Sequence, residues 1–360
     1  MTESILITGG AGFIGSHLAD RLLEQGHRVR AFDNLTPQVH GGVQRPDYLA
    51  PDVELVVGDV RDADAVRRAL DGIDSVVHLA ARVGVGQSMY EIANYTAENS
   101  AGTAVLLEAL LDRPVRKLVV ASSMSIYGEG RYEPEQPAPR TRAQLERDEW
   151  EPAGVRPVPT PETKQPDLSS VYALTKYDQE RLCLVFGDAY NVPAVALRFF
   201  NVYGTRQALS NPYTGVLAIF ASRLLNDKAP LVFEDGLQRR DFVSVHDIAR
   251  ACELALTHDG ADGRAVNVGS GRSVTVLEIA AKLGETLGKE IEPEVTGNYR
   301  FGDIRHCFAD ISLARETLGY EPRDELEDGM RMLAEWLEGQ VATDRVDAAT
   351  EELRSRGLTL

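Results

Sequence analysis

Short hydrophobic runs alternate with amphipathic stretches along the first third of the chain. The hydrophobic runs predict buried strands at residues 4–8, 28–32, 53–57, 75–80 and 117–121. The amphipathic stretches predict helices at residues 13–25, 63–70 and 95–111. Strands that alternate with helices indicate a doubly wound α/β fold, in which helices cover both faces of a parallel sheet.

The pattern changes after residue 128. A proline- and charge-rich segment predicts a long surface loop with one helical turn near 142–149, because proline cannot join regular ladders. A helix at 170–190 and a strand at 194–199 follow, and then a more irregular region. We therefore expect a Rossmann-type domain, a smaller C-terminal α/β lobe whose chain crosses back near 240–260, and a docked or frayed tail. The corresponding ranges are 1–200 (with the long loop at 129–167), 201–338 and 339–360.

Composition narrows the choice of partners. The 360 residues carry a formal charge of −17, from 38 Lys and Arg against 55 Asp and Glu, which disfavours nucleic acid and anionic membranes. No run approaches the roughly 18 apolar residues of a membrane span, and no secretion signal is evident. Three widely spaced cysteines fit reduced thiols in the cytoplasm and form no zinc pattern, so we expect no metal site: Cys183, Cys252 and Cys307.

The first candidate site is a glycine run that follows the first strand and opens the first helix. Gly9 permits a tight turn, and Gly12 lets a pyrophosphate approach the helix N-terminus, where free N–H groups favour anions. Gly15 allows the helix to pack closely on the strand. The spacing is G-x-x-G-x-x-G, and its place between strand and helix predicts a dinucleotide site.

Acidic residues end the next two strands. Asp33 lies about 20 residues after the glycines, where a carboxylate accepts hydrogen bonds from the adenosine ribose and repels a 2′-phosphate. This position favours NAD over NADP. Asp59 ends the third strand and is a candidate for the adenine edge, or simply a turn residue.

Tyr172 and Lys176 stand four residues apart, and so share one face of the predicted helix. An ammonium group beside a phenol favours the phenolate, which lowers the phenol pKa and turns it into a usable base. Ser123, at the end of a strand about fifty residues earlier, offers a hydroxyl that can orient a substrate oxygen.

Taken together, these motifs resemble the extended short-chain dehydrogenase/reductase family. Further stretches resemble its nucleotide-sugar epimerase/dehydratase branch: residues 78–81, 197–204, 240–248 and 302–305. The resemblance covers about residues 4–335. It implies an NAD-binding Rossmann domain, a lobe that binds a nucleoside diphosphate sugar, and a homodimer formed through the helices of Asn99 and Tyr172.

The resemblance also implies the residues of both sites. Tyr172 would be the base, Lys176 its ribose- and phenolate-contacting partner, and Ser123 the hydroxyl on the reacting oxygen. Cofactor contacts are implied for Gly9, Gly12, Phe13, Ile14, Gly15, Asp33, Asn34, Asp59, Val60, Leu79, Ala80, Ala81, Asn99, Ser122, Tyr172, Lys176 and Phe200. Substrate contacts are implied for Val83, Ser88, Ser123, Ser125, Tyr172, Asn201, Val216, Leu231, Phe233, Arg240, Arg300, Asp303 and Arg305.

Among the implied substrate residues, the arginines answer a physical need. A few guanidinium groups can neutralise a pyrophosphate in an otherwise acidic protein. Asn201, Arg240 and Arg305 are the first candidates for diphosphate ligands, and Arg300 competes with them.

The residues after Ser123 bear on the reaction. Sugar 4,6-dehydratases of this family usually carry an Asp-Glu pair where Met124 and Ser125 stand, and glucuronate decarboxylases carry Glu at Ser125. Methionine cannot transfer a proton and serine is a poor acid, so both reactions are disfavoured. Reversible oxidation at C4 needs only Tyr, Lys, Ser and NAD, which favours a 4-epimerase.

Several alternatives stay open. The 206–215 stretch, the 123–128 run and the long loop resemble a bacterial subgroup assigned as dTDP-L-rhamnose 4-epimerases, whose long loop often carries Cys-x-x-Cys. This chain has no cysteine there, so UDP-glucose, UDP-galactose and their uronates remain candidate substrates. A 4-ketoreductase or dehydrogenase that releases its nicotinamide each turnover, or a 4,6-dehydratase, is the alternative enzyme. A non-catalytic NAD sensor is disfavoured because Tyr172 and Lys176 are both present.

Overall fold

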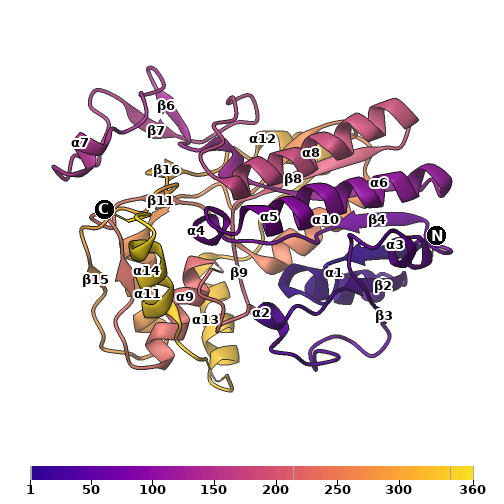
Figure 1. Cartoon of the computed structure of the whole chain (residues 1–360), viewed down its shortest axis with the longest axis horizontal. Helices are drawn as coiled ribbons and strands as arrows, with labels where there is room; N and C mark the ends of the chain where they lie inside the picture. Colours follow the sequence, from indigo (N-terminus) through magenta and orange to yellow (C-terminus); the bar gives the residue numbers. More distant parts are fainter. Residues whose placement is uncertain (1, 214, 341, 360) are drawn as a thin grey trace.

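The computed structural model describes residues 2–213, 215–340 and 342–359. Its central element is a seven-stranded sheet in which every neighbouring pair is parallel (Figure 1). The strands lie in the order β13 (Ala265–Val268), β8 (Ala194–Phe199), β5 (Lys117–Ser123), β4 (Ser75–His78), β1 (Ser4–Thr8), β2 (Arg28–Asp33) and β3 (Glu54–Val57). This confirms the predicted doubly wound sheet. Strand β13, which comes from much later in the sequence than the other strands, forms one edge of this sheet.

Helices cover both faces of this sheet because side chains alternate along each strand. In β1, Ile5 and Ile7 enter one core and Leu6 enters the other. The first core includes α1 (Phe13–Glu24), α10 (Val245–Thr257) and α12 (Ser312–Leu318). The second includes α3 (Ala63–Ala69), α6 (Gly102–Asp112) and α8 (Val171–Tyr190).

A third core forms a smaller lobe from later segments. Its helices are α9 (Val216–Leu225), α11 (Val276–Thr286) and α13 (Leu326–Leu337). Three small sheets accompany them, formed by β10 (Leu231–Val232) with β15 (Glu294–Val295), by β14 (Val274–Thr275), β11 (Arg239–Arg240) and β16 (His306–Cys307), and by β12 (Phe242–Ser244) with β9 (Asn201–Tyr203). Figure 1 places this lobe beside one end of the large sheet.

Two segments differ from the sequence predictions. The predicted helix at 95–111 is divided into α5 (Ile92–Tyr95), a π-helix η1 (Thr96–Ala101) and α6. The predicted irregular loop contains an antiparallel pair, β6 (Arg131–Glu133) with β7 (Arg156–Val158), besides the turn α7 (Arg142–Leu145). Pro157 is tolerated because a two-stranded ribbon consists only of edge strands.

Short helices complete the connections. They are α2 (Pro37–His40), α4 (Val85–Ser88) and the 3₁₀-helix η2 (Met124–Tyr127). Near the end of the chain, α14 (Val346–Ser355) lies beside α9 and α4 (Figure 1). The described part of the tail is therefore docked.

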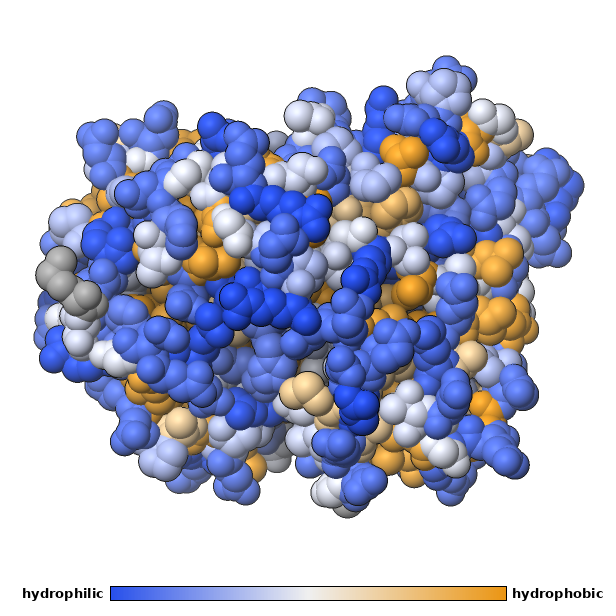
Figure 2. Space-filling view, turned by 180° about the vertical axis from the view of Figure 1, so that it is seen from behind, coloured by the Kyte–Doolittle hydropathy of each residue, from blue (hydrophilic) through white to orange (hydrophobic). Residues whose placement is uncertain are grey.

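The charge-rich composition is visible as a largely polar surface (Figure 2). Figure 2 shows a face dominated by hydrophilic residues, with hydrophobic residues scattered in small groups.

Within the described ranges, no helix has the length and apolar character needed to cross a bilayer. The same residues contain no cluster of three His, Cys, Asp or Glu side chains arranged for a metal ion.

Candidate active site

One cavity of about 600 Å³ lies at the carboxyl ends of the central strands. Residues after β1, β2, β4, β5 and β8 line one side, and residues of α9, β10 and β11 line the other. The carboxyl edge of an open parallel sheet is where α/β proteins bind ligands. The sheet and the smaller lobe therefore bring together residues as far apart in sequence as Gly9 and Asp303.

The glycine turn forms one end of the cavity. Gly9 has a φ of +69°, a conformation that favours glycine, and a Cβ there would lie 2.9 Å from the backbone nitrogen of Ala80. A Cβ on Gly15 would collide with the carbonyl oxygen of Gly9. Gly12 is the N-cap of α1 and has no side-chain cap, so the N–H groups of the first turn face the cavity.

Asp33 lies in the cavity at the end of β2, as predicted. It is buried, and its two carboxylate oxygens accept hydrogen bonds from the backbone N–H of Ala11 at 3.1 Å and of Leu35 at 2.9 Å. Asp59 does not line the cavity. Its carboxylate pairs with Arg61 at 2.6 Å, and that hydrogen bond lowers the Asp59 pKa to about 2.

Tyr172 is held on the first turn of α8. Ser170 caps this helix by accepting a hydrogen bond from the backbone N–H of Ala173 at 3.1 Å. The Tyr172 backbone N–H donates to Ser88 Oγ at 3.0 Å. Ser88 was predicted to contact substrate, but it lies outside the cavity lining and positions Tyr172 instead.

The electrostatics of Tyr172 differ from the sequence prediction. Burial raises the pKa of Tyr172, and a hydrogen bond with Ser123 opposes that rise. Lys176 Nζ donates to Gln179 Oε1 at 2.7 Å, and burial lowers the Lys176 pKa to about 8. The Tyr172 pKa therefore shifts upward, opposite to the predicted lowering, because burial outweighs the hydrogen bond with Ser123 and Lys176 does not contribute to the shift.

A buried polar network supports the base helix. Asn99 donates to Thr175 Oγ1 at 3.0 Å and accepts a hydrogen bond from the Arg82 backbone N–H at 2.7 Å. Asn99 therefore acts behind the cavity rather than in its lining, as a residue that supports the site. Ser122 lines the cavity and donates to Glu180 Oε2 at 2.7 Å.

Arg240 and Arg300 bring positive charge to the opposite side of the cavity. The Arg240 guanidinium donates to three backbone carbonyls, of Arg239, Ile304 and Arg305, and no carboxylate of the described chain forms an ion pair with it. The Arg300 guanidinium pairs with Asp303 at 2.8 Å and lies 4.3 Å from the centroid of the Phe233 ring. A cation held by carbonyl groups alone is suited to an anionic ligand.

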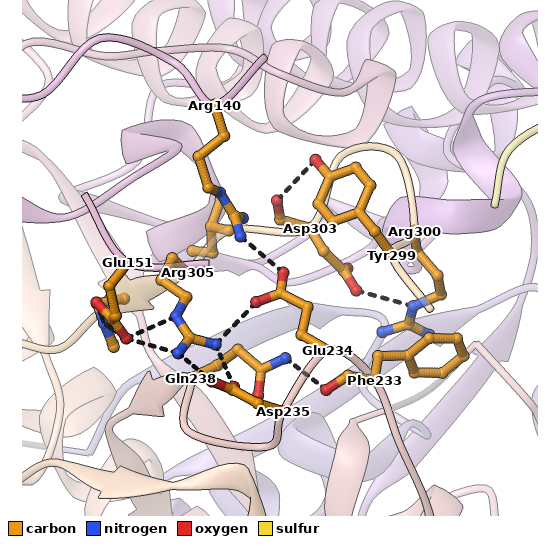
Figure 3. Close-up of polar contacts among 12 residues, drawn as sticks. Arg140, Glu151, Phe233, Glu234, Asp235, Gln238, Tyr299, Arg300, Asp303 and Arg305 are labelled. Atoms are coloured by element: carbon orange, nitrogen blue, oxygen red, sulfur yellow. Dashed lines mark hydrogen bonds and ion pairs between the residues drawn. The ribbon is translucent and has the colours of Figure 1, made fainter. Parts of the chain in front are cut away.

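Arg305 corrects the sequence prediction. Its side chain is fully buried outside the cavity lining, and it pairs with Glu234 at 2.9 Å, Asp235 at 2.6 Å and Glu151 at 2.5 Å (Figure 3). Three carboxylates already compensate its charge, so it is not available to a diphosphate. It joins the long loop, through Glu151, to the smaller lobe.

Asn201 also lies in the cavity, and its buried Oδ1 has no hydrogen-bond partner in the described chain. The other predicted residues that line the cavity are Phe13, Ile14, Asn34, Val60, Leu79, Ala80, Ala81, Val83, Ser123, Ser125, Phe200, Val216, Leu231, Phe233 and Asp303. Sequence analysis missed the contributions of α2 and α14, which include Gln38, Val346 and Leu353. For α14, apolar residues at helical spacing were the available signal.

The profile of the "NAD dependent epimerase/dehydratase family" matches residues 5–269. The chain belongs to this family. NAD is the cofactor that the family implies, and the described residues fit it. A Cβ on Gly9 would lie 2.9 Å from the Ala80 backbone nitrogen and one on Gly12 3.2 Å from the Gly9 carbonyl oxygen, so the turn favours glycine at both positions. The buried Asp33 carboxylate stands where a ribose is expected.

Similar proteins are sugar-nucleotide enzymes. The chain is 37% identical to dTDP-L-rhamnose 4-epimerase of Burkholderia thailandensis, over 93% of this chain and 95% of that protein. It is 32% identical to a putative UDP-glucose 4-epimerase of Methanocaldococcus jannaschii, over 94% and 100%. The solved structure of UDP-glucose 4-epimerase from Thermotoga maritima with UDP-glucose is 33% identical and superposes with a TM-score of 0.79, over 93% of this chain and 98% of that chain.

Proposed function

We propose that this protein is an NAD-dependent nucleotide-sugar 4-epimerase that acts on a dTDP- or UDP-hexose. The observation that carries the proposal is one cavity with Tyr172 and Ser123 on the sheet side and Arg240 and Arg300 on the lobe side. These groups suit the sugar and the diphosphate of a nucleoside diphosphate sugar. Relatives named as 4-epimerases, at 30% to 37% identity, support the same assignment.

The substrate would be held at its diphosphate. Arg240 offers a guanidinium with no carboxylate partner in the described chain, and Arg300 offers a second beside Phe233. Charge-assisted hydrogen bonds from guanidinium to phosphate are short and strong. The Phe233 and Leu231 side chains provide an apolar surface for the nucleobase. This arrangement leaves the sugar directed towards Tyr172.

At the sugar, Tyr172 accepts the proton of the C4 hydroxyl while Ser123 hydrogen-bonds the same oxygen. Bound NAD supplies the hydride acceptor at C4 and afterwards the hydride donor. The 4-keto sugar turns about its bond to the diphosphate, which Arg240 and Arg300 keep in place. When C4 is reduced again, the hydride adds to its opposite face, and Tyr172 returns the proton to the C4 oxygen. The product is the C4 epimer.

The residues near Ser123 support this reaction over dehydration. Met124 and Ser125 both line the cavity beside it. Neither can serve as the acid that removes water across C5 and C6.

The decisive experiment incubates the purified protein with dTDP-L-rhamnose, UDP-glucose or UDP-glucuronate, without added cofactor. An epimerase brings one C4 epimer pair to equilibrium with no net change in the absorbance of reduced nicotinamide. A reductase or dehydrogenase instead shows a stoichiometric absorbance change when cofactor is supplied. A dehydratase releases a 4-keto-6-deoxy product. Either of those outcomes would overturn the proposal.

We also propose a cytoplasmic homodimer. Exposed apolar side chains on the outer faces of neighbouring helices support the dimer: Leu174 and Val185 on α8, Ile92 on α5 and Leu111 on α6. The three cysteines are free and buried, in keeping with a reducing compartment. Sedimentation of the protein and of a Leu174→Glu variant tests the dimer, because the variant should sediment as a monomer.

In this proposal the chain divides by task. Residues 1–200, with the returning segment around 240–269, would bind NAD. The lobe within 201–338 would hold the nucleotide sugar. The capture of the substrate therefore depends on groups from both parts.

A further inference from the structure

The helix α14 presents one apolar stripe inward. Val346, Ala349 and Leu353 are buried, at spacings of three and four residues, whereas the side of Asp347 and Glu351 is exposed. Such spacing places side chains on one helix face. A helix with a single buried face must lie against something apolar.

That face is directed at the active-site cavity. None of the three side chains belongs to the three hydrophobic cores of the described chain, and all three line the cavity together with Leu358. A Cβ added to Gly86 would lie 3.4 Å from the Leu353 methyl groups. Gly86 belongs to α4, whose Ser88 accepts the hydrogen bond from the backbone of Tyr172. Leu353 therefore borders the end of the cavity that holds the base.

Polar contacts fasten both ends of the segment. At its start, Asp347 pairs with Lys228 at 2.8 Å and also with Arg223, a residue of α9. At its end, the Arg356 guanidinium lies 4.4 Å from the centroid of the Tyr90 ring. The Phe301 backbone N–H donates to the Leu358 carbonyl at 3.0 Å. The helix thus spans from the smaller lobe to the segment beside the base.

We propose that α14 forms a roof over the substrate cavity and retains the 4-keto sugar until hydride returns to it. The proposal rests on the proposed 4-epimerase function. Oxidation at C4 breaks the C–H and O–H bonds, sends a hydride to NAD and a proton to Tyr172, and leaves a neutral ketone at C4. If the ketone escapes, one reduced cofactor is left on the enzyme. An epimerase must therefore keep this intermediate enclosed while the sugar turns.

Leu353 and Arg356 are the positioning residues of this roof. Leu353→Ala removes the side chain that closes the gap above Gly86. Arg356→Ala removes the contact with Tyr90 that fastens the helix end. The matched control is Arg354→Ala, because Arg354 lies on the exposed side of the same helix and pairs only with Glu351 among the described residues.

The experiment compares the wild type with the three full-length variants. Free 4-keto sugar is trapped with hydroxylamine and counted by mass spectrometry against epimer formed, and reduced nicotinamide is read by absorbance. We expect Leu353→Ala and Arg356→Ala each to raise the ratio of released ketone to epimer by about tenfold, the effect of losing one such contact. One reduced cofactor should accumulate per released ketone. Arg354→Ala should match the wild type.

A second measurement separates this proposal from the proposed function. The rate at which bound nucleotide sugar dissociates is measured by stopped flow for the same proteins, whether or not they epimerise it. A roof predicts faster dissociation in Leu353→Ala and Arg356→Ala, again by about tenfold. Wild-type protein without epimerase activity would overturn the proposed function alone. Unchanged dissociation in both variants would overturn the roof.

Discussion

Arg305 Nη1 lies 2.9 Å from Glu234 Oε2, and both side chains are almost completely buried. Asp235 and Glu151 complete the coordination of the same guanidinium, and Arg140 pairs with Glu234 from the long loop at 2.9 Å. Because a buried charge is stable only when it is paired, this cluster fixes the loop against the lobe. It lies next to Arg240, whose guanidinium donates to the Arg305 carbonyl at 2.8 Å. Two neighbouring arginines therefore have different tasks.

The first prediction separates those tasks. Arg305→Met should lower the free energy of unfolding by about 3 kcal/mol, because it leaves the buried Glu234 without one of its cations. Arg240→Met should instead raise the KM for the nucleotide sugar by about 10- to 100-fold, because a charge-assisted contact to the diphosphate is lost. Urea denaturation and initial-rate kinetics on both variants measure this. If Arg305→Met raised the KM strongly and left the stability unchanged, Arg305 would have to be assigned to the diphosphate after all.

Arg300 and Arg305 show how much of the site could be predicted from sequence alone. Motifs that depend on local geometry, such as Gly9 after a strand and Tyr172 four residues before Lys176, lie on the elements that the sequence predicts, because strand and helix periodicity fix those elements. Arg300 and Arg305 stand only five residues apart in an irregular segment. Which of them faces the cavity depends on carboxylates from Glu151 and Glu234, far away in sequence. No periodic pattern reports such a tertiary contact.

The pKa of Tyr172 was beyond sequence reasoning for a related reason. The spacing to Lys176 correctly places both on one helix, but the Lys176 ammonium is directed to Gln179. Burial by surrounding elements then decides the direction of the pKa shift. For α14, the stripe of Val346, Ala349 and Leu353 was readable as an amphipathic helix. Its position over the cavity was not.

The second prediction concerns the base. Tyr172→Phe should lower kcat by about 10³-fold, because proton transfer by a positioned side chain contributes about 10² to 10⁴. The matched control is Tyr177→Phe on the same helix, since Tyr177 packs against the first core and does not line the cavity. Epimerisation is followed by chromatography of the sugar nucleotides. Comparable losses in the two variants would point to disruption of α8 rather than to loss of a base.

The third prediction concerns cofactor choice. Asp33→Asn should narrow the preference for NAD over NADP by about tenfold, because it removes a negative charge that repels a 2′-phosphate. Asp59→Asn is the control, since Asp59 pairs with Arg61 outside the cavity lining. Dissociation constants for both cofactors are measured by calorimetry on protein freed of bound nucleotide. If only the Asp59 variant changed the preference, the adenine end of the cofactor would have to be placed differently.

The fourth prediction concerns pH. Burial raises the pKa of Tyr172, so the phenolate fraction, and with it the rate of C4 oxidation, should increase as the pH rises through the neutral range. The hydrogen bond with Ser123 lowers that pKa, and its loss in Ser123→Ala should move the rising limb of the kcat/KM profile to higher pH. Ser125→Ala is the control, because Ser125 lines the cavity but has no part in the Tyr172 shift.

The position of the limb, rather than its height, decides this case. Ser123 also faces the reacting oxygen in the proposed mechanism, so its removal should lower the plateau as well. A purely structural role for Ser123 would lower the plateau and leave the limb where it stands in the wild type. A limb displaced to higher pH in Ser123→Ala and not in Ser125→Ala ties the hydroxyl directly to ionisation of the base. A displacement to lower pH would mean that Ser123 stabilises the neutral phenol. The roles assigned to the Ser123 and Ser125 hydroxyls would then have to be exchanged.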